Sequence, residues 1–189
     1  NLVQDLEKDI TYEQIALHLH IVDEDGIDDI ESIYCIHDET ELFWKIDKQN
    51  WNIYKENNES WIGSNSIVMN DYSALPRGDY RIIALDVTGE RDGTEIYVGE
   101  TSYNPDRLSF PKAEITAKDI TISSKYDENI LRVYAERDTS IKTFKTGAKQ
   151  IRRSMLLPNI EEQRSASQLY IYAFNDDYSI GVISGPYYF

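Results

Sequence analysis

The chain has 189 residues, of which 41% are hydrophobic, and it carries a formal net charge of −15. This length suffices for one large domain or two small ones. The acidity argues against a nucleic-acid partner, because phosphate binding needs a basic surface. The single cysteine, Cys35, excludes an internal disulfide, and the apolar runs are too short for a membrane-spanning helix.

The charge is distributed unevenly along the chain. Residues 1–110 contain 24 acids and 8 bases, whereas residues 111–189 contain 10 acids and 11 bases. Such a shift in composition is typical of two domains. The stretch GETSYNPDRLSFPK at 99–112 has two prolines and no periodicity, which indicates a linker. We therefore predict a domain over 1–100, a linker over 101–112 and a second, smaller domain over 113–189.

Alternating apolar residues predict strands in both halves. In the first half the predicted strands are 14–22, 30–36, 42–46, 51–54, 66–69, 80–87 and 94–98. In the second half they are 120–123, 130–136, 141–144, 150–155, 168–174 and 180–183. Helix signals are weak, and a short helix within 5–16 is doubtful because of its Ile and Thr content. Since about seven strands per hundred residues is typical of a β-sandwich, we predict an all-β protein of two tandem β-sandwiches.

The segment LPRGDY at 75–80 has the spacing of a tyrosine corner. In a sandwich, a Tyr at the start of the penultimate strand bonds back to the chain a few residues upstream. We expect Leu75 in the core, Gly78 in the turn, and the Tyr80 hydroxyl bonded to the backbone of 74–78. The tripeptide Arg77-Gly78-Asp79 also matches an integrin-binding motif, but short motifs match by chance often, and the corner explains it structurally.

The corner, together with DEDGIDDI earlier, resembles the immunoglobulin-like domains of bacterial envelope and secreted proteins over residues 14–98. The end of the chain, LYIYAF followed by NDDYSIGVISGP, resembles the last two strands of a fibronectin type III module. The Trp that such modules carry in an early strand is absent, so Leu131 or Val133 would take its place.

This resemblance implies an extracytoplasmic location, in the periplasm or at the cell surface. A signal peptide with a lipid-bearing Cys upstream of Asn1 would make the chain the ectodomain of a lipoprotein. The implied role is a non-catalytic binding, spacer or assembly module whose partner is a protein or a cell-surface glycan. Because GxSxG, HExxH and phosphate-loop motifs are missing from the sequence, we expect neither catalysis nor a cofactor.

An acidic turn, DEDGIDDIE at 23–31, provides carboxylates for calcium. The candidate ligands are Asp23, Asp25, Asp28 and Asp29. An EF-hand alignment fails, because Ile21 and Ser32 would occupy its first and last ligand positions. A looser calcium site and a solvated acidic turn remain as alternatives.

A second candidate metal site rests on strand pairing. If 14–22 and 30–37 form a hairpin, the polar face collects His18, His20, Cys35 and His37. Imidazole and thiolate are good ligands for transition metals. The alternative is that the imidazoles are unligated and that Cys35 packs as a small apolar side chain.

Aromatic side chains give a further candidate site. Trp51, Tyr54 and Trp61 border polar segments and could stack on a carbohydrate, whereas Trp44 belongs to an apolar face with Leu42 and Ile46. A basic run in the second half could dock an acidic surface or form a solvated face. It comprises Arg137, Lys142, Lys145, Lys149, Arg152 and Arg153.

Overall fold

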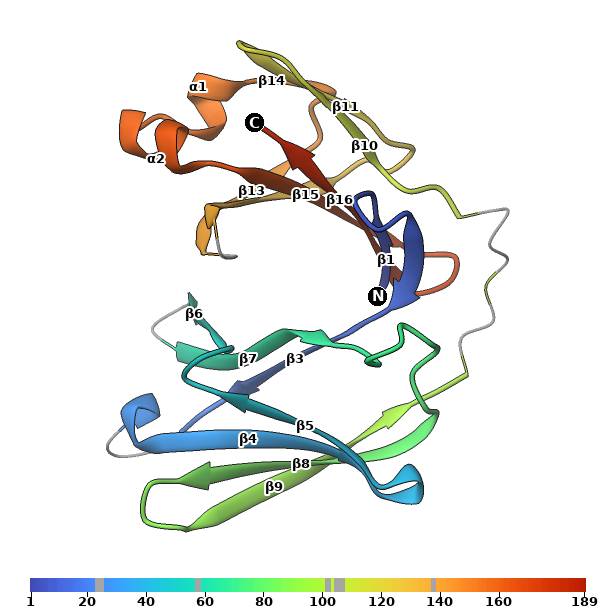
Figure 1. The fold of residues 1–189 in the computed structure, drawn as a ribbon, viewed down its shortest axis with the longest axis vertical. Helices are drawn as coiled ribbons and strands as arrows, with labels where there is room; N and C mark the ends of the chain where they lie inside the picture. The colour runs from blue at the N-terminus through green and yellow to red at the C-terminus, as the bar shows by residue number, and fades with distance from the viewer. Residues whose placement is uncertain (23–25, 57–58, 101–102, 104–107, 137–138) are drawn as a thin grey trace. The chain divides into compact units, whose positions relative to one another are not determined.

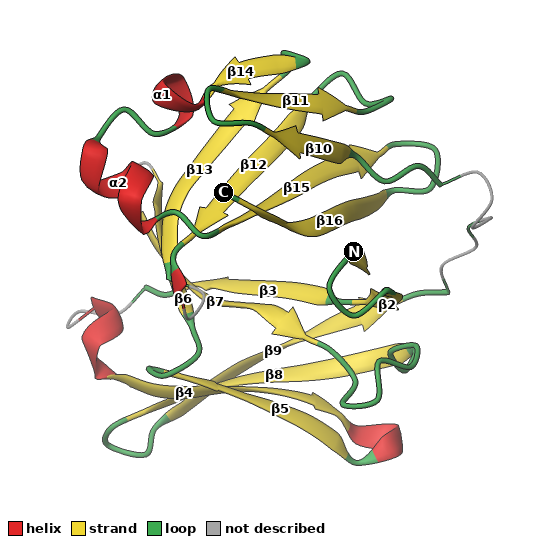
Figure 2. Cartoon of the chain, turned by 45° about the horizontal axis from the view of Figure 1, so that its top comes forward, coloured by secondary structure: helices red, strands yellow, loops and turns green. Residues whose placement is uncertain are grey.

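A computed structural model describes residues 1–22, 26–56, 59–100, 103, 108–136 and 139–189, and strands dominate it (Figures 1 and 2). The two α-helices in these ranges are short, α1 at Arg153–Leu156 and α2 at Ile160–Ser165. The predicted all-β fold is confirmed. No helix among these residues is both long enough and apolar enough to cross a bilayer.

The chain divides into two compact units. We call Glu13–Thr101 the acidic unit, because its sequence contains 20 acids and 6 bases. We call the other the composite unit, because it combines Asn1–Tyr12 with Ser102–Phe189. Each unit is described by itself.

The described part of the acidic unit contains seven strands. They are β3 (Ile15–His20), β4 (Ile30–His37), β5 (Leu42–Asp47), β6 (Asn52–Glu56), β7 (Glu59–Ile67), β8 (Gly78–Asp86) and β9 (Arg91–Val98). They form a four-stranded sheet in the order β5-β4-β8-β9 and a three-stranded sheet in the order β3-β7-β6. In the immunoglobulin constant arrangement the second strand joins the sheet of the first, whereas here β4 lies between β5 and β8.

The core of the acidic unit lies between its two sheets. Leu17 of β3 and Ile62 of β7 meet Ile33 of β4, Ile46 of β5 and Ile82 of β8 in one buried cluster. Because residues from both sheets interleave in this cluster, the sheets pack face to face as in a β-sandwich.

The composite unit also contains two sheets. Its described elements are β1 (Leu2–Asp5), β2 (Ile10–Glu13), β10 (Lys112–Ile115), β11 (Asp119–Ser123), β12 (Asn129–Tyr134), β13 (Ser140–Thr146), β14 (Gln150–Arg152), β15 (Gln168–Asn175), β16 (Ile180–Tyr188) and both α-helices. The sheet orders are β13-β12-β15-β16-β1-β2 and β10-β11-β14. A core cluster joins Ile120 and Ile151 of the small sheet to Leu131 and Ile171 of the large one, with Leu156 of α1.

The first strand belongs to the same sheet as the last. β1 pairs in parallel with β16, so that Leu2 lies opposite Val182 and Val3 opposite Ile183 (Figure 1). Parallel strands are usually buried on both faces and read as apolar runs, and β16 is buried from Ile180 to Pro186. Residues 1–12 therefore belong to the same compact unit as residues 102–189. The sequence had placed them in the first domain, over 1–100.

Candidate functional site

The tyrosine corner is confirmed. Tyr80 has no exposed surface, and its hydroxyl donates a hydrogen bond of 2.9 Å to the carbonyl of Pro76. Leu75 is buried, and Gly78 has a φ of 120°, which a residue without Cβ adopts readily. Burial raises the pKa of Tyr80 to about 12, so this hydroxyl remains a donor throughout the physiological range.

The integrin-like tripeptide is tied into the fold at its arginine. The Arg77 guanidinium donates to both carboxylate oxygens of Glu13 at 2.7 and 2.8 Å, and also to the carbonyl of Leu75. The same carboxylate accepts from the Leu75 backbone N–H at 3.0 Å. The hydrogen bond from Arg77 holds the pKa of Glu13 below its usual value. Arg77 is therefore a structural residue, held in the fold by Glu13.

The predicted hairpin of histidines and cysteine is wrong. β3 pairs with β7, whereas β4 pairs with β5 and β8, so His18 and His20 lie in a different sheet from Cys35 and His37. In the part of the chain that the structure describes, no group of three or more His, Cys, Asp or Glu side chains is placed to hold a metal ion. The hairpin was predicted because two alternating runs flank the polar turn DEDGIDD, but the chain crosses to the other sheet at this turn.

Cys35 and His37 point into the core of the acidic unit instead. Cys35 has no exposed surface, and burial raises the pKa of its thiol to about 11. His37 is 2% exposed and lies between the Arg77 carbonyl, 2.9 Å from Nε2, and the Thr40 hydroxyl, 2.8 Å from Nδ1. Since a carbonyl only accepts, Nε2 carries a proton and donates a hydrogen bond to the Arg77 carbonyl. The His37 imidazole therefore packs against the tyrosine corner, and its ring centroid lies 4.8 Å from that of Tyr80.

Half of the predicted calcium ligands, Asp23 and Asp25, lie outside the described residues. The other two, Asp28 and Asp29, lie in a 3₁₀ turn at Gly26–Asp29, with Asp28 exposed and Asp29 half-buried. Lys48 Nζ donates to the backbone carbonyl of Asp28 at 3.1 Å. The calcium site stays a prediction.

The three residues of the predicted carbohydrate site do not lie together. Trp51 packs against the core of the acidic unit. In β7, Trp61 lies directly opposite Tyr54 of β6 and His20 of β3, and the His20 and Trp61 rings have centroids 5.1 Å apart. The structure therefore places Trp61 and Tyr54 in one row across the three-stranded sheet.

The four-stranded sheet carries apolar side chains on its outer face, a feature that sequence analysis missed. Antiparallel sheets with one solvated face usually alternate apolar and polar residues. In β4, Ile33 and Cys35 face the core, so Tyr34 and Ile36 face outward, and their register partners share that face. We define the outer patch by its five apolar residues, which are Tyr34, Ile36, Phe43, Ile83 and Leu85.

The outer patch is accessible. Phe43 is 63% exposed, and the other four side chains are half-buried. The rings of Tyr34 and Phe43 have centroids 6.4 Å apart. Gly93 lies opposite Ile83 in β9 and has no side chain to cover it. A contiguous apolar group on a sheet face is typical of a protein interaction site.

Charges of both signs surround the outer patch on the same face. The outward positions of the four strands also hold Lys45, Asp47, Asp79, Arg81, Arg91 and Glu95. Arg81 forms a two-point ion pair with Asp38 at 2.6 and 2.9 Å. This face thus holds three of the six bases in the acidic unit against four of its 20 acids, so it is less acidic than the unit as a whole.

Comparison with models of known protein families and with curated proteins gave no match for this chain.

Proposed function

We propose that the protein is a non-catalytic assembly module of a bacterial cell envelope protein, and that its acidic unit associates with a second copy of the chain through the outer patch. The extracytoplasmic location and the kinship with immunoglobulin-like and fibronectin type III-like modules rest on the resemblance seen in the sequence. The hydrogen bond from Tyr80 to Pro76 supports that kinship, whereas the sheet position of β4 is a departure from it.

One observation carries the proposal, namely the exposed apolar surface of the outer patch. Leaving such side chains in water is unfavourable by roughly 25 cal/mol per Å² of apolar area. The outward positions of β4 and β8 are occupied by Tyr34, Ile36, Ile83 and Leu85, none of which the core of the acidic unit requires. A partner that covers them recovers this free energy.

The charges favour a second copy as the partner. The acidic unit as a whole repels another acidic unit, but this face carries bases as well as acids, with Lys45 on β5 and Glu95 on β9. A two-fold axis between two facing sheets, parallel to the strands, places β5 of one copy over β9 of the other. Lys45 and Phe43 of one copy then face β9 of the other copy, which holds Gly93 and Glu95. The two-fold axis repeats this contact, so that it occurs twice in the dimer.

Sedimentation equilibrium over a wide concentration range tests this proposal. We expect the wild-type chain to dimerise and the variants Phe43→Asp and Ile83→Lys to remain monomeric. Phe174→Asp is the matched control, because Phe174 is an exposed aromatic residue of the composite unit, and it should still dimerise. A wild-type chain that stays monomeric, or patch variants that dimerise normally, would refute the proposal.

Charge reversal tests the two-fold arrangement itself. Lys45→Glu and Glu95→Lys should each weaken the dimer, because each places like charges on two facing strands, two residues apart along the strand. The double variant carries both reversals, and we expect it to restore dimerisation. If the double variant is weaker than both single variants, the pairing of β5 with β9 is incorrect.

Carbohydrate binding is a second candidate, favoured by the neighbouring rings of His20 and Trp61 on the three-stranded sheet. An aromatic face such as that of Trp61 can stack on a sugar. Affinity electrophoresis in gels containing cell-wall polysaccharides tests this function. Retention that is lost in Trp61→Ala supports it, and equal mobility with and without polysaccharide refutes it.

A further inference from the structure

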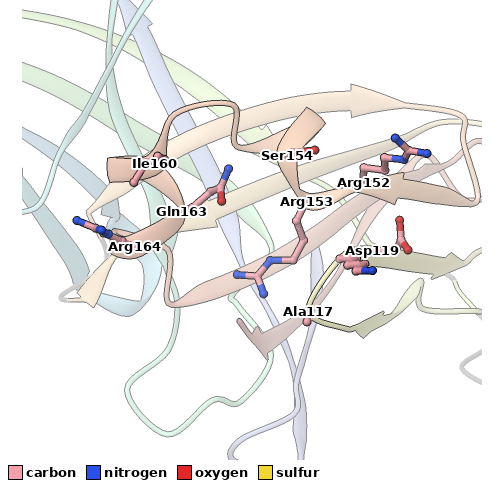
Figure 3. A pocket seen from close by; sticks show the side chains of 9 residues that line it. Ala117, Asp119, Arg152, Arg153, Ser154, Ile160, Gln163 and Arg164 are labelled. Atoms are coloured by element: carbon pink, nitrogen blue, oxygen red, sulfur yellow. The ribbon is translucent and has the colours of Figure 1, made fainter.

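A pocket of about 760 Å³ in the composite unit is lined by three segments. They are the turn between β10 and β11, the junction of β14 and α1, and the helix α2 (Figure 3). Figure 3 shows the Arg153 side chain extending between α2 and the turn at Ala117, with Arg164 on one side and Arg152 on the other. The pocket lies in the unit that the proposed dimer does not use.

The lining of this pocket is strongly basic. Lys118, Arg152, Arg153 and Arg164 line it together with a single carboxylate, Asp119. None of these four cations forms an ion pair with any residue that the structure describes, whereas Lys8, Lys45, Arg77, Arg81 and Lys145 all do. In a chain with 34 acids, four cations around one pocket without carboxylate partners create a local positive potential, which attracts anions.

Backbone contacts hold the basic segments together. The Arg153 backbone N–H donates to the Lys118 carbonyl at 2.8 Å, and Asp119 lies opposite Arg152 in the sheet. The Arg153 guanidinium lies over the ring of Phe189, with 5.0 Å between its central carbon and the ring centroid. A guanidinium held over a ring face can still donate its N–H groups to other partners. Arg153 is therefore a half-buried, oriented donor rather than a freely moving surface charge.

Polar and apolar groups complete the lining. Gln163 is fixed because its side-chain amide donates to the Leu157 carbonyl at 2.6 Å. Ser154 adds a hydroxyl, and Ala117 and Ile160 add apolar surface. A pocket of this size with several donors and some apolar wall suits a small organic molecule rather than a bare halide.

We propose that this pocket binds a small molecule that carries a multiply charged oxyanion, of the phosphate or polycarboxylate type. Arginine recognises both groups through paired N–H···O bonds, because its planar fork matches two oxygens of the ligand. Arg153 is the central donor, and Lys118, Arg152 and Arg164 balance the remaining charge. Binding is reversible and involves no covalent step.

Isothermal titration of the full chain tests the site with two probes, inorganic pyrophosphate and citrate, at an ionic strength fixed with sodium chloride. We expect one binding site per chain for at least one probe. The probe that binds more tightly identifies the oxyanion as phosphoryl or carboxylate. Arg153→Gln and Arg164→Gln should each weaken binding by about tenfold or more, as expected for the loss of a charge-assisted hydrogen bond.

Lys112→Gln is the matched control, because Lys112 is an exposed base at the opposite end of β10 from the pocket. It should leave the dissociation constant unchanged while removing the same charge. The site is refuted if neither probe binds beyond the effect of chloride. It is also refuted if Lys112→Gln weakens binding as much as Arg153→Gln, because the attraction would then come from general charge. Melting temperatures of all variants, compared with the wild type, show whether a loss of binding reflects a loss of folding.

Discussion

At the scale of single residues, the tyrosine corner makes the most direct prediction. Tyr80→Phe removes the hydroxyl that bonds to Pro76 and leaves the ring in place beside His37. We expect the free energy of unfolding to fall by about 1 kcal/mol or somewhat more, the net value of a buried hydrogen bond with one partner left unsatisfied. Urea denaturation followed by tryptophan fluorescence measures this loss. A variant as stable as the wild type would show that the corner hydrogen bond contributes nothing.

The ion pair of Glu13 and Arg77 predicts how stability depends on pH. The pKa of Glu13 is lowered in the folded state from an ordinary value of 4.5, so the pair stabilises the fold above that pH. This contribution declines as the pH falls below 4.5 and is gone once the pH is below the folded-state pKa. Glu13→Gln should lower the free energy of unfolding at pH 7 by about 2 kcal/mol, because it breaks a partly buried charge-assisted pair.

Denaturation of the wild type and Glu13→Gln at a series of pH values checks the sign of this effect. The difference between the two proteins should be largest at neutral pH and should shrink on acidification. Asp79→Asn, which changes the neighbouring exposed acid of the tripeptide, serves as the control and should show a small difference throughout. A difference between wild type and Glu13→Gln that grows in acid would contradict the assignment.

At the scale of the element, β4 carries apolar residues on its core face and on its outward face. Substitutions on the two faces should change the free energy of unfolding by different amounts. Ile33 has no exposed surface, so Ile33→Ala should cost about 3 kcal/mol through lost transfer energy and a cavity. Ile36 faces outward, so Ile36→Thr should change stability by about 0.5 kcal/mol or less at low protein concentration. Denaturation at several concentrations compares them. Equal costs would mean that the two faces of β4 had been assigned incorrectly.

This strand also shows which parts of the fold were predictable from sequence. The strand at 30–36 was expected, because its β-branched and aromatic residues indicate a strand on either face. Which face enters the core was not predictable, since Ile33 with Cys35 and Tyr34 with Ile36 give equally good patterns. The histidine and cysteine site failed for a further reason, because β3 and β4 lie in different sheets and do not form the predicted hairpin. The corner at Tyr80 was predictable, because its spacing is local and needs no knowledge of partners.

Other elements were missed because they depend on distant partners. β1 and β2 have too few residues for a periodic pattern, and β10 begins inside the predicted linker. The helix α2 begins after Asn159, whose side chain accepts from the Glu161 backbone N–H. That capping residue was a usable signal. The basic pocket could not be assembled from sequence, since it joins segments around Lys118, Arg153 and Arg164 that only the fold brings together.

At the scale of the whole molecule, the division into two compact units predicts that the composite unit can be destabilised without unfolding the acidic unit. Val3 is buried and lies opposite Ile183. Val3→Asp should destabilise the composite unit by about 3 kcal/mol or more, because it places an unpaired carboxylate in a buried site. Leu6→Asp is the control, because Leu6 is 42% exposed. It should have little effect on either unit.

Two spectroscopic signals distinguish the units in this experiment. All three tryptophans, Trp44, Trp51 and Trp61, belong to the acidic unit, so their fluorescence reports on that unit alone. Far-ultraviolet circular dichroism reports on the strands of both. In Val3→Asp we expect the circular dichroism to develop an earlier transition while the fluorescence midpoint stays where it is in the wild type. If both signals shift together, the units do not unfold independently.

The parallel pairing of β1 with β16 has a consequence for synthesis on the ribosome. Chains fold as they emerge, and an element can settle only when its partner has been made. The acidic unit has all of its residues once Thr101 has emerged, whereas β1, made before that unit, waits for residues 180–188. During that interval Leu2 and Val3 lack the strand that buries them, so they are exposed apolar residues to which a holding chaperone would bind. A strand made late in synthesis therefore buries a strand made much earlier.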